Sequence, residues 1–227
     1  TETGVKVNGM LAMVVGNEFA VNHVPMEAGQ NTITVEATDI NARTASASVM
    51  IASAPEDSYI KVTAVRESGI SPFETSLLVD ASLNFEAHSF SHSGPGDVDI
   101  LSASPERYKV KMTAPGLYFF TAQAVDDQDK TCTDTIAIAV IDPVRVDALC
   151  RSKWDGMKTA LINGDIEQAL TYHHGSSRTR YTVIYNALGG DLPSLARQMR
   201  EMSPIVLDDT HAKYRIKQDH AIEGRNI

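Results

Sequence analysis

The chain has 227 residues, enough for two or three domains, because one hydrophobic core serves roughly 100 to 200 residues. Apolar residues make up 43% of it and charged residues 22%, a balance that excludes an intrinsically disordered protein. The net charge is −9, because residues 1–142 carry eight basic and nineteen acidic side chains and residues 143–227 carry twelve basic and ten acidic ones. This distribution argues against nucleic acid or an anionic membrane as a partner, and no apolar run is long enough to span a bilayer.

Residues 4–51 alternate apolar and polar positions in short runs separated by turn pairs. Asn8-Gly9 and Gly16-Asn17 supply the positive φ that tight hairpins require. We predict a β-sandwich domain over residues 1–52. Its inward-facing residues, by period-two spacing, are Val5, Val7, Leu11, Met13, Phe19, Val21, Ile33, Val35, Ala37, Ala45, Ala47 and Val49.

A short polar break with one proline follows at residues 52–58. Apolar alternation then resumes, and turn residues at 93–96 and at Pro115-Gly116 interrupt it. The strands this predicts are 60–65, 76–80, 85–90, 108–112, 118–125 and 133–141. We therefore predict a second β-sandwich over residues 53–142.

The apolar period changes from two to 3.6 after Asp142-Pro143. Val146, Leu149, Cys150, Met157 and Leu161 would share one face of a first helix. Breaks at 163–165, at 176–177 and at 192–194 separate three further helices, and strands are expected at 204–207 and 212–217. We predict an α+β domain over residues 143–227.

The first segment resembles the bacterial Ig-like family named after domain B of glucodextranase. Val7-Asn8-Gly9, Val24-Pro25 and residues 29–39 carry this resemblance over residues 4–51, with Met26 in place of the usual Leu. Members of the family begin with two strands before this hairpin. The resemblance thus implies that an upstream segment, or a partner chain adding a strand to an exposed sheet edge, completes the first sandwich.

The second segment, residues 59–142, resembles a PKD-type Ig-like repeat in Val79-Asp80-Ala81-Ser82 and residues 115–121, although Asp129-Lys130 replaces a usual Gly. Residues 144–227, including 153–157 and 212–216, are similar to the α+β domain that follows such repeats in large bacterial surface and Rhs-type proteins. That resemblance implies a cone-like fold, a curved sheet around a helix, with one or two strands after Ile227.

The expected fold class is accordingly multidomain, with two antiparallel Ig-like β-sandwiches followed by a small cone-like α+β domain. The start at Thr1 lacks an initiator Met and a signal sequence, so we expect a mature or excised fragment.

Two groups of side chains are candidate metal ligands. Asp126, Asp127 and Asp129 cluster in one turn and could bind Ca²⁺, or could form a solvated acidic turn. His88 and His92 would share one face of a strand and could bind zinc with a third ligand, or could be two surface histidines. Apart from Ca²⁺, no cofactor is expected.

The tail offers a candidate ligand pocket and a weak catalytic motif. Four aromatic residues could line a cavity or form the core: Trp154, Tyr181, Tyr185 and Tyr214. His173-His174 lie beside Ser176-Ser177, but the sequence contains no Gly-x-Ser-x-Gly elbow, so we expect no catalysis there. Cys132 and Cys150 are interpreted as two thiols, with a single disulfide as the alternative.

These features together predict a non-enzymatic structural or interaction segment of a secreted or cell-surface bacterial protein. Its partners would be proteins or further domains of the same polypeptide. One alternative is an accessory module of a secreted enzyme or Rhs-type toxin, with carbohydrate binding through aromatic residues of the second sandwich: Tyr108, Tyr118, Phe119 and Phe120. Another is a filament or homo-oligomer formed by strand exchange.

Overall fold

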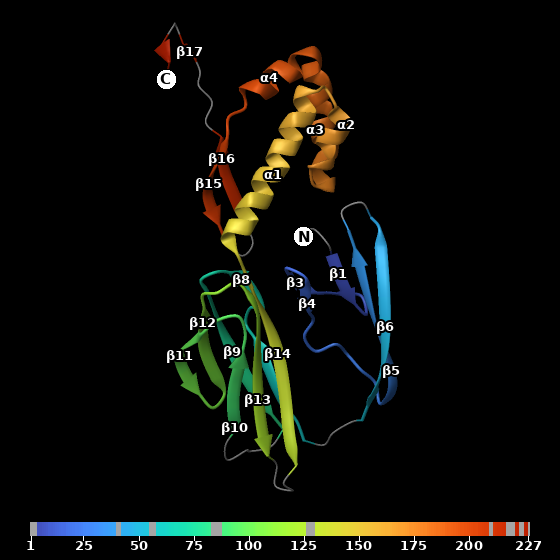
Figure 1. Cartoon of the computed structure of the whole chain (residues 1–227), viewed down its shortest axis with the longest axis vertical. Coiled ribbons are helices and arrows are strands. Elements are labelled where there is room, and N and C mark those ends of the chain that lie inside the picture. The colour runs from blue at the N-terminus through green and yellow to red at the C-terminus, as the bar shows by residue number, and fades with distance from the viewer. Residues whose placement is uncertain are drawn as a thin grey trace. The chain divides into compact units, whose positions relative to one another are not determined.

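The computed structural model describes residues 4–39, 42–54, 58–82, 88–125, 130–208, 211–216, 221–222 and 225–226. The chain divides into two compact units, Thr1–Asp142 and Pro143–Ile227. The first unit contains strands β1 to β14, and the second contains the helices and the remaining strands (Figure 1). None of the helices in the described residues is long and apolar enough to cross a membrane.

The first module of unit 1 comprises β1 to β6 and is built on an antiparallel sheet of order β2-β1-β5-β6. Asn8 and Gly9, with φ of 47° and 82°, join β1 to β2 in the two-residue turn that the sequence predicts. The strand bounds are β1 Gly4–Val7, β2 Met10–Leu11, β3 Met13–Val15, β4 Glu18–Ala20, β5 Gly29–Thr38 and β6 Thr44–Ser53.

The β3–β4 hairpin contacts β1 and, with the four-stranded sheet, forms a sandwich-like pair. Val5, Val7 and Ala12 are buried in this module. The expectation that Ala45, Ala47 and Val49 face a core is wrong, because all three are exposed. They lie on the same face as the buried valines, but the described residues place no second sheet opposite β6. Leu11 and Phe19 of the predicted inward set are exposed as well.

The second module of unit 1 comprises β7 to β14 and is a sandwich of two four-stranded sheets, ordered β10-β13-β14-β8 and β11-β12-β9-β7. The strand bounds are β7 Ile60–Ala64, β8 Ser68–Ile70, β9 Phe73–Ala81, β10 His88–Ser93, β11 Val98–Ser104, β12 Arg107–Met112, β13 Gly116–Val125 and β14 Thr131–Ile141. All pairings are antiparallel except that of β8 with β14.

The core of the second module lies between its two sheets, where alternate residues of the long strands are buried. Tyr118 and Phe120 of β13 are fully buried, and Phe119 between them points outward. Gly69 is required by packing, because a Cβ there would lie 2.0 Å from the ring of Phe73. The two antiparallel Ig-like β-sandwiches expected from the sequence are thus present.

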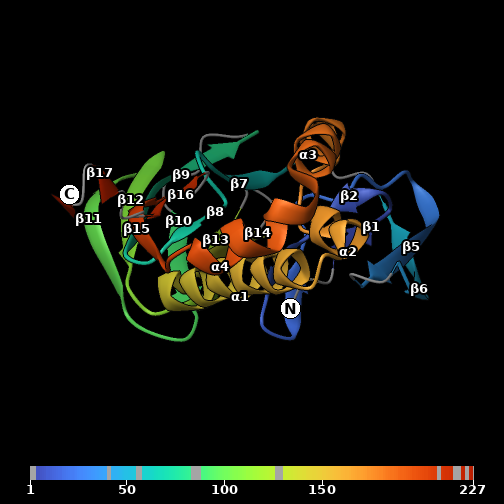
Figure 2. The same ribbon diagram turned by 90° about the horizontal axis from the view of Figure 1, so that it is seen from above.

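Unit 2 is a helical region followed by a β-hairpin, which is the expected order of helices and then strands; the cone-like fold that the resemblance implies stays a prediction. Its elements are α1 Pro143–Ile162, α2 Ile166–Thr171, α3 Gly175–Leu188, the 3₁₀ turn η1 Gly189–Asp191, α4 Leu192–Gln198, β15 Met202–Leu207, β16 Ala212–Ile216, β17 Ala221–Ile222 and β18 Arg225–Asn226. α4 packs against α1, and the two helices are neighbours in both views (Figure 1 and Figure 2). The buried residues of this core are Met157, Ala160, Leu161, Ala169, Tyr185, Leu192 and Ala196.

Candidate functional site: an intermodule clasp and an open sheet edge

Asn22, in the loop after β4, joins the two modules of unit 1 by a bidentate contact with β14. Its Nδ2 donates to the carbonyl oxygen of Ala137 at 2.9 Å, and its Oδ1 accepts from the Ala137 amide at 2.8 Å. A side-chain amide thereby satisfies both backbone groups of a strand residue, as a neighbouring strand would. Both bonds are partly buried, so their loss would leave the Ala137 amide and carbonyl oxygen without hydrogen-bond partners.

The neighbouring His23 makes the second contact between the modules. Its Nε2 lies 3.1 Å from Oδ2 of Asp134, and the same oxygen accepts the Val62 amide at 2.7 Å. Val62 belongs to the opposite sheet of the sandwich, so one carboxylate ties together the loop and both sheets. We call Asn22, His23, Asp134 and Ala137 the intermodule clasp.

The clasp closes the outer edge of β14. β8 pairs with this edge only at Ala139 to Ile141, and Asn22 takes the next outward-facing amide and carbonyl at Ala137. Ala137 and Ala139 are buried. β14 is therefore protected as an edge strand along this stretch.

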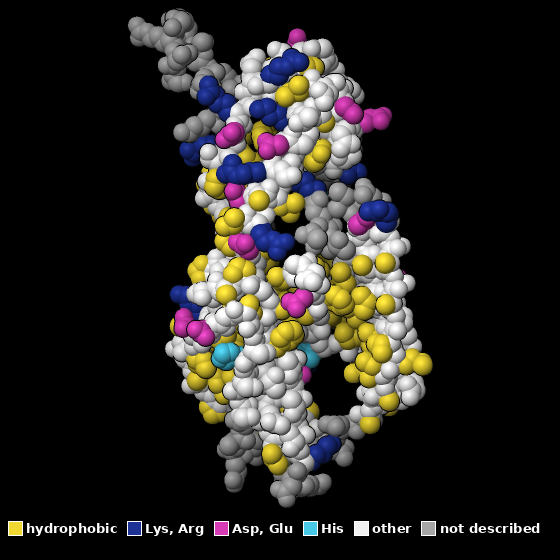
Figure 3. Space-filling model, viewed as in Figure 1, with side chains coloured by type: hydrophobic (Ala, Val, Ile, Leu, Met, Phe, Trp, Pro, Cys, Tyr) yellow, Lys and Arg dark blue, Asp and Glu magenta, His cyan; other side chains and the backbone are white. Residues whose placement is uncertain are grey.

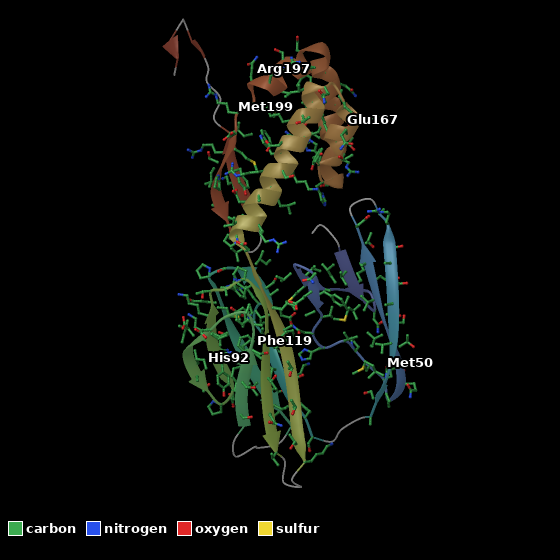
Figure 4. All side chains as sticks on the ribbon, viewed as in Figure 1. Met50, His92, Phe119, Glu167, Arg197 and Met199 are labelled. Atoms are coloured by element: carbon green, nitrogen blue, oxygen red, sulfur yellow. The ribbon has the colours of Figure 1, made fainter. Side chains whose placement is uncertain are left out.

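β6 has the opposite character, because it pairs with β5 on one side and with no described strand on the other. Val49, Met50 and Ile51 are 55%, 75% and 41% exposed. Hydrophobic side chains gather over the β5–β6 sheet in Figure 3, and Figure 4 labels Met50 among them. We call the unpaired side of β6 the open edge.

The predicted metal ligands lie only partly within the described residues. Asp126, Asp127 and Asp129 lie outside them, and so does the side chain of His88. His92 is exposed on β10, where its ring lies 6.1 Å from that of Phe120. In the part of the chain that the structure describes, no three His, Cys, Asp or Glu side chains group as metal ligands.

The four predicted pocket aromatics take two different places in unit 2. Tyr185 is buried in the helical core, and Trp154 and Tyr181 pack against that core. Tyr214 on β16 instead donates to Oδ1 of Asp147 at 2.9 Å. A shallow cavity of about 160 Å³ is lined by Arg151, Trp154, Asp155, Glu201 and Met202, so Trp154 alone of the four reaches it.

The histidines next to Ser176 have separate structural roles. His174 caps α3, with its Nδ1 accepting from the Ser176 amide and lying 2.9 Å from Ser176 Oγ. His173 stacks on Tyr181 at 4.0 Å, and its Nε2 lies 2.8 Å from the Tyr185 hydroxyl. Burial lowers the pKa of His173, and the charge of Arg178 lowers it further. These contacts belong to a helix cap and to core packing.

The four aromatic residues proposed as a carbohydrate platform do not form an exposed pair. Phe119 is exposed (Figure 4), but Tyr118 and Phe120 are fully buried. Tyr108 stacks on Phe90 at 4.0 Å against the core of the sandwich. Cys132 and Cys150 are both free thiols, the first buried and the second half-buried.

Comparison with known proteins shows no family membership. No family model and no curated protein matches the chain. Solved structures similar to it include cadherin domains of PcdhgB3, with 18% identity over 50% of this chain and 32% of that chain, and a TM-score of 0.30. The fibronectin(III)-like modules of Clostridium thermocellum CbhA have 15% identity over 62% of this chain and 77% of that chain, with a TM-score of 0.29.

A third similar structure is the Bacteroides ovatus mixed-linkage glucan utilization locus protein SGBP-B in complex with a heptasaccharide. It has 12% identity over 61% of this chain and 37% of that chain, with a TM-score of 0.20. The chain spans well under two thirds of the PcdhgB3 and SGBP-B chains. The two sheet pairs of unit 1 themselves define the class, modular Ig-like β-sandwich proteins.

Proposed function

We propose that this chain is a structural and interaction segment of a larger secreted or cell-surface bacterial protein, without a catalytic site of its own. In this role the two β-sandwich modules act as a rigid spacer, and the helical unit joins the spacer to a partner or to the next region. The intermodule clasp is the observation that carries the proposal, because a flexible tether would not need it.

The clasp supports rigidity through directed contacts. Asn22 holds one residue of β14 by two opposed hydrogen bonds, which fixes both its position and its orientation. His23 and Asp134 add a contact at a second point, and two points of attachment restrict rotation between the modules.

Asn22→Ala is expected to loosen the two modules and to lower the free energy of unfolding of unit 1 by about 1–2 kcal/mol, because a backbone amide and carbonyl lose their partners. The measurement is the distance distribution between spin labels on the exposed positions Thr32 of β5 and Ser102 of β11, in the full chain. We expect a narrow distribution in the parent protein and a broad one in the variant.

The matched control is Asn186→Ala, the same change at an exposed position on α3. It should leave the distribution unchanged. A distribution that is already broad in the parent protein would contradict the rigid-spacer role.

An accessory role beside a secreted enzyme or Rhs-type toxin is the second candidate. It rests on three resemblances. Residues 4–51 resemble the glucodextranase domain B type, residues 59–142 resemble PKD-type repeats, and residues 144–227 resemble the domain that follows such repeats in large bacterial surface and Rhs-type proteins. The Asn8-Gly9 turn has the backbone geometry that the first resemblance requires. The neighbouring domains of the full-length protein decide between the candidates, since a glycosidase or toxin domain favours the accessory role and further Ig-like repeats favour the spacer.

A further inference from the structure

β6 is the least protected strand edge among the described residues. All ten of its residues pair with β5 without a register shift, and none of them is charged or proline. Natural sheets protect their edges with charges, prolines, bulges or short strands. A long, regular, uncharged edge is the form that accepts another strand.

Most of the other outer strands of the two modules carry such protection. β2 has two residues and β8 has three, and β11 is interrupted by a bulge between Ile100 and Ser102. β7 carries Lys61, and the intermodule clasp covers β14 at Ala137. β10 has six residues, of which only Phe90 is apolar. Among the described outer strands, β6 alone is therefore long, regular and uncharged with several exposed apolar side chains.

The hydrogen bonds of β5 show which backbone groups of β6 point outward. The Thr34 carbonyl oxygen accepts a hydrogen bond from the Asn8 amide, and the Thr34 amide donates one to Asn8 Oδ1. Both groups therefore point to the β1 side of the sheet. Thr34 and Ser48 are thus a non-hydrogen-bonded pair, and the amide and carbonyl of Ser48 face the open edge. The same holds for every second residue: Thr44, Ser46, Met50 and Ala52.

β6 is complementary to a second copy of itself. In an antiparallel pairing about Val49, Ser48 faces Met50 of the other copy, and both have outward-pointing backbone groups. Ile51 then faces the small Ala47, and Val49 faces Val49. Nine residues of each strand are paired in this register. Because the strand is uncharged, no ion is desolvated and no like charges meet.

We propose that the open edge pairs antiparallel with β6 of a second copy of this chain, about a two-fold axis at Val49. The two four-stranded sheets join into one continuous sheet, and the exposed Val49 and Ile51 gain apolar neighbours. This pairing deepens the interaction role proposed above, and rests on it, by naming the partner.

Sedimentation of the full chain across a range of concentrations tests the pairing. The parent protein should show a monomer–dimer equilibrium, and Val49→Lys should weaken the dimer at least about tenfold, since two ammonium groups would meet at the axis. Val65→Lys is the matched control, because Val65 is 65% exposed but lies in the second module. A monomer up to about 1 mM, or equal weakening by both variants, would overturn the proposal.

Cysteine cross-linking tests the register in a folded protein, in a background with Cys132 and Cys150 replaced by alanine. A non-hydrogen-bonded pair brings the Cα atoms to about 4.5 Å, within disulfide range. Val49→Cys should therefore oxidise to a covalent dimer. Met50→Cys, although more exposed, should not, because it faces Ser48 of the other copy. Faster cross-linking at position 50 than at 49 would overturn the pairing about Val49.

The two proposals fail separately. A monomer with a narrow distance distribution removes the pairing and leaves the spacer role. The remaining occupants of the open edge are then an upstream segment of the same polypeptide or a strand of a different protein. A dimer with a broad distribution removes the spacer role and leaves the pairing.

Discussion

His173 is the residue through which we expect the stability of the helical unit to depend on pH. Its ring is stacked on Tyr181, contacts the Tyr185 hydroxyl and is partly buried. The Tyr185 hydroxyl also lies 3.7 Å from Sδ of Met157 in the core. A proton on His173 would add a charge to this cluster, next to the cationic Arg178, and this is why its pKa is lowered.

We expect unit 2 to lose stability as the pH falls below about 6.5, the ordinary pKa of an unfolded histidine. The unfolded chain takes up the proton first, because the folded pKa is lower, so the free energy of unfolding decreases with falling pH. His173→Gln keeps a donor and an acceptor but cannot titrate, and should lose most of this slope. Urea unfolding at about pH 7.5 and about pH 5 measures it.

His92→Gln is the control, because His92 is exposed on β10 of unit 1 and lies outside the helical unit. An equal change of slope in both variants would contradict a specific role for His173.

At the scale of elements, one carboxylate attaches the C-terminal hairpin to α1. The Asp147 carboxylate accepts a hydrogen bond from Nε of Arg151 at 2.8 Å and one from the Tyr214 hydroxyl at 2.9 Å. Nη1 of Arg151 donates in turn to the carbonyl oxygen of Met202. The bond from Arg151 and then that from Tyr214 lower the pKa of Asp147. Burial and the same bond raise the pKa of Tyr214.

Tyr214→Phe removes one of these bonds and keeps the ring. We expect faster hydrogen exchange in β15 and β16, with α2 and α3 unchanged, because of these side-chain bonds only that from Arg151 to Met202 then joins the hairpin to α1. Tyr59→Phe removes a similar bond to Asp80 in unit 1 and is the matched control. Unchanged exchange in the hairpin would show that packing, rather than the Tyr214–Asp147 bond, holds it.

Several elements could be predicted from residue patterns, because each pattern has a local cause. The inward Tyr118 and Phe120 and the outward Phe119 follow from strand alternation, and the helices follow from the change of period after Asp142. The residue pattern did not predict the strands β8 and β11. β8 has only three residues, and the bulge between Ile100 and Ser102 breaks the alternation that would reveal β11.

The candidate site could not be predicted, because its partners are distant in the chain and partly backbone. Asn22 lies 115 residues from Ala137, and no property of an alanine side chain marks that contact. An exposed sheet edge in the first module is implied by the resemblance of residues 4–51, but the sequence does not place that edge on β6. Period two in β6 shows which residues share a face, but it does not show whether anything covers that face.

At the scale of the whole molecule, the two compact units have separate cores. Leu77 is fully buried in unit 1, and Leu161 is almost fully buried in unit 2. The buried cluster around Leu77 contains only residues of unit 1, and the cluster around Leu161 contains only residues of unit 2.

We therefore expect two unfolding transitions that respond to different mutations. Leu77→Ala should destabilise unit 1 by about 3 kcal/mol, and Leu161→Ala should destabilise unit 2 by a similar amount, because each leaves a cavity. Calorimetry of the full chain measures both. Leu149→Ala, at an exposed position of α1, is the control for cavity formation. A single transition shifted by either variant would contradict independent units.

The course of β14 through the second module determines how that module would respond to mechanical force. The entering chain lies beside the start of β14, where Cys132 Sγ contacts the Ser58 carbonyl and Asp134 binds the Val62 amide. The chain leaves at Ile141, the other end of the same strand. A pull on the two ends of the module would thus act along β14 and place its ten-residue ladder with β13 in shear. In shear many hydrogen bonds must break together rather than one after another, so a segment that tethers a surface protein would extend abruptly and only at high force.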